Sequence, residues 1–376
     1  MNIAFDARAL VGPVTGVGTW TTQVAAGLAG DPSRRVVLAA SKPVGLPEEL
    51  ALANVEVLPP PGAPWPGTLW MQWSLPGRLA AARTDVFIGS LGILPRRSSV
   101  PGVLMVHDLT PRTHPSRHTL ANRFCFNTWF EPSLEVAAAV VVGSAATQAD
   151  LLREFPQLAA RVRVISYGVS DFFSPGGDDG ESEEVRRQFS SGRPYILHLG
   201  TLEPRKGVRI LVEAWEQLAD SREDCPDLVL AGAPGWGIGP ILDRIRRSPR
   251  RERIHQIGYV SREHALALLR HASVFVLASE AEGFGLPLAE AICCETACVA
   301  SDIPSLRECG AEAVVYTRPN DAGGLAVALE RAMSPEVRQG LQSNARARRR
   351  SLRWAPVIEA WSEVVAEVAG GRSSAR

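Results

Sequence analysis

Two glutamates, Glu282 and Glu290, lie in the segment "EGFGLPLAE" and are well suited to contact a polar ligand. The segment follows the apolar run "VFVLA" (274–278), which predicts a buried strand. Gly283 and Gly285 remove side chains between this strand and the next helix, so backbone N–H groups are exposed to a ligand. Glu290 lies in "LAEAICC", where a charged carboxylate is costly to bury without hydrogen bonds. The alternative interpretation is a capping role for Glu282 and a surface position for Glu290.

A cationic turn is predicted in "GTLEPRKG" (200–207), which follows a predicted strand at 195–199 and opens a helix. Arg205 and Lys206 lie at the amino end of that helix, where unpaired N–H groups already favour an anion. The chain has only one other lysine, Lys42, so a compact point charge is indicated at this turn. Two adjacent cations suit a diphosphate, and a solvated basic turn is the alternative.

The elements that must position these residues form a regular alternation of short apolar runs and helical patterns. Strands are predicted at 2–5, 35–40, 55–58, 85–89, 102–106, 138–143, 162–166, 195–200, 227–232, 253–258, 274–279, 297–301 and 313–316. Helices are predicted at 17–29, 69–82, 118–136, 145–154, 207–220, 238–247, 261–272, 286–294, 321–333 and 335–350. Such alternation predicts parallel sheets covered on both faces.

The Gly- and acid-rich stretch "SPGGDDGESEE" (174–184) interrupts this alternation and is interpreted as part of an interdomain linker. The fold class is therefore predicted as α/β, with two doubly wound, Rossmann-like domains facing a central cleft, where ligands bind beyond the carboxyl ends of the strands. We expect an amino-terminal domain at 1–173, a linker at 174–194, a second domain at 195–354 and a closing segment at 355–376.

Composition excludes several classes of protein. Lys+Arg and Asp+Glu number 40 each, which argues against a dedicated nucleic-acid binder. No basic start followed by an apolar run is present, so no signal peptide is expected, and no apolar run is long enough for a membrane-spanning helix. The six cysteines lack metal-ligand spacing and are expected to be small buried thiols in a reducing cytoplasm.

Taken together, the motifs of this chain resemble those of retaining glycosyltransferases of family 4, which have the GT-B fold, and in particular a bacterial mannosyltransferase-like group. The resemblance covers nearly the whole chain. Besides the two segments above, it rests on "GYV" (258–260), "SDIPSLRECGAEAVVY" (301–316), "TGVGTWT", "VHDLTP" (106–111), "VVGSAATQADL" (141–151) and "VISYGV" (164–169). The segment "SLRWAPVIEAW" (351–361) resembles the closing helix, which in this fold crosses back onto the amino-terminal domain.

The resemblance implies a role for each matching residue. Arg205 and Lys206 would neutralise the diphosphate of a nucleotide-sugar, Glu290 would accept hydrogen bonds from the ribose, and Glu282 would face the transferred sugar. His107 would reach that sugar from the opposite domain, whereas the neighbouring Asp108 is expected to be structural. The remaining residues expected at the donor are Gly16, Gly18, Gly200, Gly232, Tyr259, Val260, Gly283, Phe284, Gly285 and Leu286.

The activity implied is retaining transfer of a hexose, with mannose and a GDP-sugar as first choices, onto a saccharide or polyprenyl-diphosphate-linked acceptor in surface polysaccharide or glycolipid synthesis. No Asp-x-Asp motif is placed to bridge the phosphates through a metal, so no metal or other cofactor is expected. A nucleotide-sugar epimerase and a non-catalytic sugar-nucleotide or glycan-binding subunit remain alternatives. A dehydrogenase is disfavoured, because Gly16 lies too far beyond the first strand and Thr21 replaces the third glycine of a dinucleotide fingerprint.

Two arginine clusters, at 244–253 and 344–350, are interpreted as solvated faces. The alternative is contact with anionic lipid or with a polyprenyl-diphosphate acceptor, which would place a cytoplasmic protein at the inner face of the plasma membrane.

Overall fold

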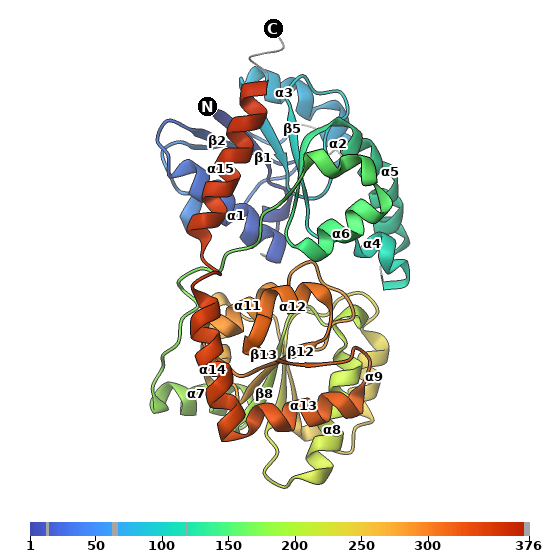
Figure 1. Cartoon of the computed structure of the whole chain (residues 1–376), viewed down its shortest axis with the longest axis vertical. Helices are drawn as coiled ribbons and strands as arrows, with labels where there is room; N and C mark the ends of the chain where they lie inside the picture. The colour runs from blue at the N-terminus through green and yellow to red at the C-terminus, as the bar shows by residue number, and fades with distance from the viewer. Residues whose placement is uncertain (13–14, 62–66, 118, 372–376) are drawn as a thin grey trace. The chain divides into compact units, whose positions relative to one another are not determined.

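The computed structural model describes residues 1–12, 15–61, 67–117 and 119–371, and the chain divides into two compact units. Residues 1–115 and 120–168, together with the chain from 354 onward, form the first unit, and residues 169–353 belong to the second. Each unit contains one parallel sheet packed against helices (Figure 1). The predicted α/β fold class is therefore confirmed at the level of both sheets.

The first unit contains a seven-stranded sheet with the strand order β3-β2-β1-β4-β5-β6-β7. Its strands are β1 (Asn2–Asp6), β2 (Arg35–Ala39), β3 (Val55–Val57), β4 (Val86–Gly89), β5 (Gly102–Val106), β6 (Ala137–Val142) and β7 (Val162–Val164). Ile3 pairs with Val36 on one side and Val86 on the other, both in parallel register. The chain therefore winds away from the β1–β4 pair in both directions.

The helices of the first unit include one that was predicted as a single element and is divided in two. Pro76 in the first turn of the second piece has no N–H to continue the hydrogen-bond ladder, so the predicted helix at 69–82 becomes α2 and α3. The α-helices of this unit are α1 (Gly16–Ala29), α2 (Gly67–Trp73), α3 (Leu75–Ala81), α4 (Thr110–Thr113), α5 (Leu120–Val136), α6 (Ala145–Glu154) and α15 (Trp354–Gly371).

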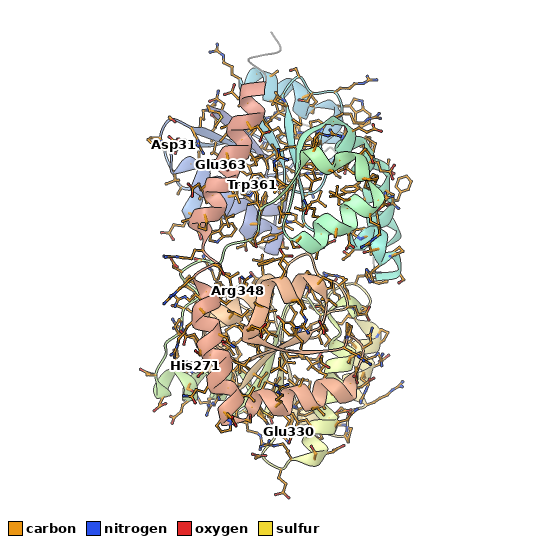
Figure 2. All side chains as sticks on the ribbon, viewed as in Figure 1. Asp31, His271, Glu330, Arg348, Trp361 and Glu363 are labelled. Atoms are coloured by element: carbon orange, nitrogen blue, oxygen red, sulfur yellow. The ribbon has the colours of Figure 1, made fainter. Side chains whose placement is uncertain are left out.

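The carboxy-terminal helix α15 packs on α1 within the first unit (Figure 1). Trp361, labelled in Figure 2, meets Trp20 edge to face with the ring centroids 5.3 Å apart, and both indoles are fully buried. Gly27 of α1 has no side chain, and a Cβ there would lie 2.5 Å from Ile358. The two helices therefore approach closely where the sequence supplies a glycine.

The second unit contains a six-stranded sheet with the order β10-β9-β8-β11-β12-β13. Its strands are β8 (Tyr195–Leu199), β9 (Asp227–Ala231), β10 (Ile254–Gly258), β11 (Val274–Leu277), β12 (Cys298–Ser301) and β13 (Val314–Thr317). Its α-helices are α7 (Asp179–Phe189), α8 (Val208–Ser221), α9 (Gly239–Arg246), α10 (Arg262–His271), α11 (Leu286–Cys293), α12 (Pro304–Gly310), α13 (Ala322–Met333) and α14 (Pro335–Arg349). Every predicted strand of both units is present, with ends that agree within two residues.

Helix α7 was not predicted, because the acid-rich stretch that begins it has no apolar period. Asp178 caps the helix by accepting a hydrogen bond from the N–H of Glu181 at 2.8 Å. Glu181 in turn lies 3.0 Å from Nε2 of His271 on α10; His271 is labelled in Figure 2. Part of the stretch interpreted as a linker is thus a helix that packs on the second unit.

Burial of the six cysteines agrees with the prediction of small core thiols: five are buried, Cys125 is partly exposed, and none forms a disulfide. In the described ranges, no helix combines the length and the apolar character needed to cross a bilayer.

Candidate functional site

Strands β8 and β11 are neighbours in the sheet of the second unit, although the chain leaves them in opposite directions. The loops after these strands, 200–207 and 278–285, therefore meet at the carboxyl edge of the sheet. The N–H of Glu280 donates to the carbonyl of Arg205 at 2.8 Å and joins the two loops. Ligands of doubly wound sheets bind at this point of reversal, so the cationic turn and the Glu282 loop lie where a site is expected.

Gly207 allows the cationic turn to pack on the end of β11. Its φ is +67°, in the left-handed region, and a Cβ at this position would lie 2.0 Å from the carbonyl oxygen of Ala278. Gly207 also caps α8, so Lys206 stands directly before the helix. A side chain at 207 would separate the two loops that form the site.

Replacing Gly207 with alanine is expected to destabilise the second unit by roughly 2–4 kcal/mol, because a left-handed conformation and a backbone clash are combined. The measurement is the midpoint of thermal unfolding. Gly340 is the matched control, since it lies inside α14 with open space around it. Gly340→Ala should raise the midpoint slightly through helix propensity. Equal midpoints for Gly207→Ala and the wild type would contradict the proposed packing.

Glu282 is held by both cations of the turn. Nζ of Lys206 donates to Oε1 at 2.5 Å, Nη1 of Arg205 donates to Oε2 at 3.2 Å, and the hydroxyl of Ser279 donates to Oε1 at 2.7 Å. The Glu282 side chain is only 8% exposed. Burial alone would raise the pKa of Glu282, but the charges of Lys206 and Arg205 outweigh it and lower this pKa to about 2. The carboxylate is therefore ionised throughout the physiological pH range.

Arg205 is oriented by further contacts. Its Nη1 donates to the carbonyl of Ala281 at 2.8 Å, and its Nη2 donates to Oε1 of Glu203 at 2.7 Å. The two cations and two carboxylates of this cluster have no net charge together. The ammonium of Lys206 has three N–H donors, of which Glu282 accepts one, so Lys206 can still donate to phosphate oxygens.

Three glycines end adjacent strands next to this cluster: Gly200 after β8, Gly232 after β9 and Gly258 in β10. A Cβ on Gly232 would lie 1.9 Å from the carbonyl oxygen of Gly200, and the N–H of Gly232 donates to Gly258 at 2.7 Å. Close packing of the strand ends is therefore one reason for Gly232. Tyr259, 61% exposed, and Val260, partly buried, follow at the same edge of the sheet.

The Gly283–Leu286 segment makes the turn into α11 as the sequence predicted. Gly285 has a φ of +97°, and a Cβ there would lie 2.5 Å from a methyl group of Leu306. Phe284 is buried, Leu286 begins the helix and Pro287 occupies its first turn. Glycine is thus required in this turn for both conformation and space.

Glu290 lies on α11, half-buried among apolar neighbours. Loss of hydration raises the pKa of Glu290 to about 8, and the charge of Arg262 opposes this only in part. Arg262 begins α10, directly after Tyr259, Val260 and Ser261, and lies over the ring of Phe172 at 4.6 Å from its centroid. Sequence reasoning missed Arg262, which follows the Tyr259–Val260 segment and whose charge acts on Glu290.

His107 belongs to the first unit and makes hydrogen bonds with both ring nitrogens. The carbonyl of Ser90 can only accept, so Nε2 carries the proton and donates to it at 2.8 Å, while Nδ1 accepts from the hydroxyl of Tyr167 at 2.7 Å. Burial lowers the pKa of His107 to about 4, so the imidazole is neutral. Tyr167, in "VISYGV", was missed as its positioning partner; Gly143 leaves the space for the Tyr167 ring, since a Cβ there would lie 2.0 Å from it.

The other predicted residues of the first unit lie at helix starts. Gly16 and Gly18 form the first turn of α1, and Thr15 caps it by accepting from the N–H of Gly18 at 3.3 Å. Asp108 accepts hydrogen bonds from the N–H and the hydroxyl of Thr110, at 2.9 and 2.6 Å, which fits the structural role expected for it.

Another polar group missed from the sequence is His198 of β8. Its Nδ1 lies 3.3 Å from the carbonyl of Val276, while its buried Nε2 has no hydrogen-bond partner in the described part of the chain. Burial first and the charge of Lys206 second lower the pKa of His198 to about 4. A neutral histidine therefore underlies the cationic turn. In the described ranges, no three His, Cys, Asp or Glu side chains are grouped so that they could hold a metal ion.

Comparison with known families and proteins relates this arrangement to known chemistry. Residues 14–171 match the model described as Glycosyltransferase Family 4, and residues 181–348 match the model of Glycosyl transferases group 1. The chain is 28% identical over 274 residues to O-antigen chain mannosyltransferase B of Escherichia coli, which covers 72% of this chain and 70% of that protein.

Solved structures resemble both units together. Sucrose-phosphate synthase of Thermosynechococcus elongatus has a TM-score of 0.79 at 19% identity and covers 99% of this chain and 100% of that chain. Anabaena Alr3699/HepE in complex with UDP-glucose has a TM-score of 0.75 at 19% identity, covering 98% and 100%. The two parallel-sheet units thus have the GT-B fold.

Proposed function

Because the chain belongs to the family 4 type of glycosyltransferases, we propose that it transfers a hexose from a nucleotide-sugar to a saccharide or lipid-linked acceptor. The observation that supports this best is the contact of Lys206 and Arg205 with Glu282 where the sheet of the second unit reverses direction. In this proposal the two cations serve the leaving diphosphate and the acid serves the sugar. The family matches do not favour an epimerase or a non-catalytic subunit.

Mannose is the first choice of sugar and a GDP-sugar the first choice of donor, since the relative from Escherichia coli is a mannosyltransferase. That relative acts on O-antigen chains, so synthesis of a surface polysaccharide or glycolipid is the proposed setting, in the cytoplasm. The GDP-sugar should be tested against UDP-glucose, which is present in the Anabaena structure.

The proposed mechanism depends on charge stabilisation and positioning. As the bond from the anomeric carbon to the diphosphate breaks, Lys206 and Arg205 stabilise the negative charge on the leaving phosphate. Glu282, fixed and ionised, orients the sugar and supports its developing positive charge. Same-face attack by the acceptor hydroxyl would retain the anomeric configuration without a protein nucleophile.

His107 and Glu290 complete the proposed donor contacts. His107 can donate to a sugar hydroxyl through Nε2 only by giving up its bond to Ser90. Glu290 would accept from the ribose hydroxyls, which suits its carboxylate form. Gly16 and Gly18 are proposed to face the diphosphate from the first unit, and Tyr259 and Val260 to lie beside the base.

The proposed function is tested with purified protein in two steps. A thermal-shift screen with GDP-, UDP-, ADP- and dTDP-sugars identifies the donor, and transfer is then followed by nuclear magnetic resonance, which reports the anomeric configuration of the product. Activity should persist in EDTA. Donor conversion without an acceptor would indicate an epimerase, whereas donor binding with neither transfer nor slow hydrolysis would indicate a binding subunit.

Glu290→Gln is expected to remove a pH dependence of donor binding. In the free protein the raised pKa keeps Glu290 protonated below about pH 8. If the ribose prefers the carboxylate, binding releases a proton, and affinity rises up to about tenfold per pH unit as the pH approaches 8. Calorimetry between pH 6 and 8 measures this slope. A wild-type slope that Glu290→Gln leaves unchanged would contradict the ribose contact.

A further inference from the structure

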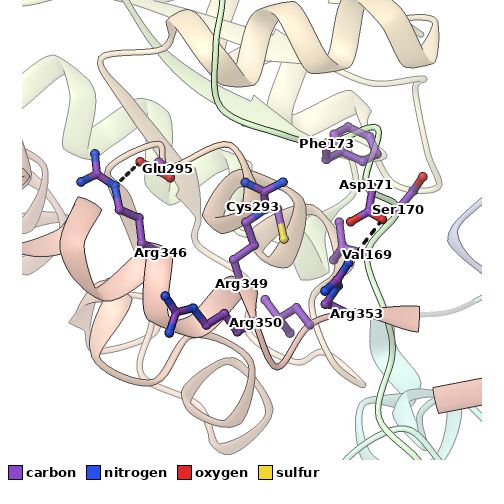
Figure 3. A pocket seen from close by; sticks show the side chains of 11 residues that line it. Val169, Ser170, Asp171, Phe173, Cys293, Glu295, Arg346, Arg349, Arg350 and Arg353 are labelled. Carbon is purple, nitrogen blue, oxygen red and sulfur yellow. Dashed lines mark hydrogen bonds and ion pairs between the residues drawn. The ribbon is translucent and has the colours of Figure 1, made fainter. Parts of the chain in front are cut away.

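A cavity of about 440 Å³ in the second unit is lined by four arginines: Arg346, Arg349, Arg350 and Arg353 (Figure 3). It is bounded by the end of α14, by Cys293 at the end of α11, and by residues 169–173. All of its lining residues belong to the second unit, and none is assigned to the donor site.

The acids of this cavity balance only half of its positive charge. Nε of Arg346 lies 2.7 Å from Glu295, and Arg353 lies 3.9 Å from Asp171 (Figure 3). Arg349 and Arg350 have no carboxylate within 4.0 Å in the described part of the chain. Burial raises the pKa of the Cys293 thiol to about 12, so Cys293 adds no negative charge. The lining therefore has an excess of two positive charges.

Binding of free carbonyl groups at the end of a helix does not explain the presence of Arg349 and Arg350. Arginines near a helix end commonly bind free carbonyl groups, and Arg348, labelled in Figure 2, does this by donating to the carbonyls of Cys309 and Glu308 at 2.8 and 2.6 Å. In the described part of the chain, no such side-chain bond is made by Arg349 or Arg350. Both residues line the cavity instead, Arg349 partly buried and Arg350 exposed.

We propose that this cavity binds a phosphate or diphosphate group at a second site, distinct from that of the nucleotide-sugar. Planar guanidinium groups match pairs of phosphate oxygens, and two unbalanced charges fit one such group. The volume lies in the range of small-molecule sites. The group can belong to a soluble phosphorylated molecule or to a lipid headgroup.

A ligand bound in this cavity would contact both places where the chain passes from one unit to the other. Val169 and Arg353, the terminal residues of the second unit, form a parallel bridge, and both line the cavity. The N–H of Val169 donates to the carbonyl of Leu352 at 2.7 Å. An anion held by Arg353 and Arg349 is thus expected to stabilise this bridge and raise the midpoint of thermal unfolding.

The test is calorimetric titration with inorganic pyrophosphate in the Lys206→Ala variant, where the donor site is impaired. Saturable binding should remain there, and adding Arg349→Ala and Arg350→Ala should weaken it about tenfold or more. The matched control adds Arg331→Ala and Arg338→Ala, which remove two exposed charges of the second unit outside the cavity. This control should leave the affinity within about twofold, because distant exposed charges are screened.

A second measurement separates the two sources of the phosphate. Co-sedimentation with phosphatidylglycerol vesicles, compared with phosphatidylcholine vesicles, should depend on Arg349 and Arg350 if a lipid headgroup is the ligand. Vesicle binding without pyrophosphate binding would assign the site to a lipid. The proposal is overturned if neither probe binds in the Lys206→Ala variant, or if the control variant loses as much affinity as the cavity variant. Neither result bears on sugar transfer, which is measured separately.

Discussion

Replacing Lys206 with alanine is expected to lower sugar transfer about a hundredfold or more, because one positioned charge on the leaving diphosphate is lost. Lys206 is only 12% exposed and lies beside Arg205, so water replaces its ammonium poorly. The loss should appear mainly in kcat, since the negative charge on the leaving group grows during bond breaking. The measurement is steady-state kinetics with the identified donor.

Lys42→Ala is the matched control, because Lys42 is the only other lysine and is exposed in the first unit. It should leave the rate unchanged. Lys206→Arg, which keeps the charge but not the compact ammonium, should retain more activity than Lys206→Ala. Near-normal turnover by Lys206→Ala would remove the cationic turn from the mechanism.

Replacing Glu282 with alanine is expected to reduce transfer by a similar factor, about a hundredfold. The change removes the proposed sugar contact and also the acceptor that orients Lys206, Arg205 and Ser279. Because the pKa of Glu282 is lowered to about 2, its ion pairs contribute stability above the ordinary pKa of 4.5 and lose it as the pH falls toward 2. Steady-state rates between pH 5 and 9 should therefore show no titration of this group.

Glu282→Gln separates charge from shape. The amide can still accept a hydrogen bond from Lys206 or Ser279, so this variant should keep its fold while losing most of its activity. Glu223→Ala is the control for removal of an acid, since Glu223 is exposed in the second unit. If the Glu282→Gln variant transferred sugar at the wild-type rate, the proposal that the charge of Glu282 stabilises the sugar would be wrong.

Much of the fold was predictable because local patterns decide it. Most of the parallel strands are mainly apolar runs, and the segments between them have helical periodicity, so all strands were placed from the sequence. Helix α7 was not predicted, because Val185 is its only buried residue. The break between α2 and α3 was not predicted either, because it depends on Pro76 within an otherwise helical pattern. These differences arise where apolar periodicity is absent or where one residue overrides it.

The site was only partly predictable, because its contacts join residues distant in sequence. The sequence placed Lys206 and Glu282 at one ligand, but their direct ion pair requires the β8–β11 pairing, which no local pattern reveals. Similarly, both nitrogens of His107 are occupied through Ser90 and Tyr167. Tyr167 lies 60 residues from His107 in the sequence. Burial and partners of this kind come from tertiary packing.

The return of α15 to the first unit affects how the chain is made. Residues 169–353 of the second unit are contiguous, so their sheet can form as soon as they leave the ribosome. The first unit must wait for α15 before the surface of α1 around Trp20 and Gly27 is covered. Until α15 has been made, the apolar surface of α1 around Trp20 stays exposed, and any premature stop before Trp354 leaves that surface open to aggregation or chaperone capture.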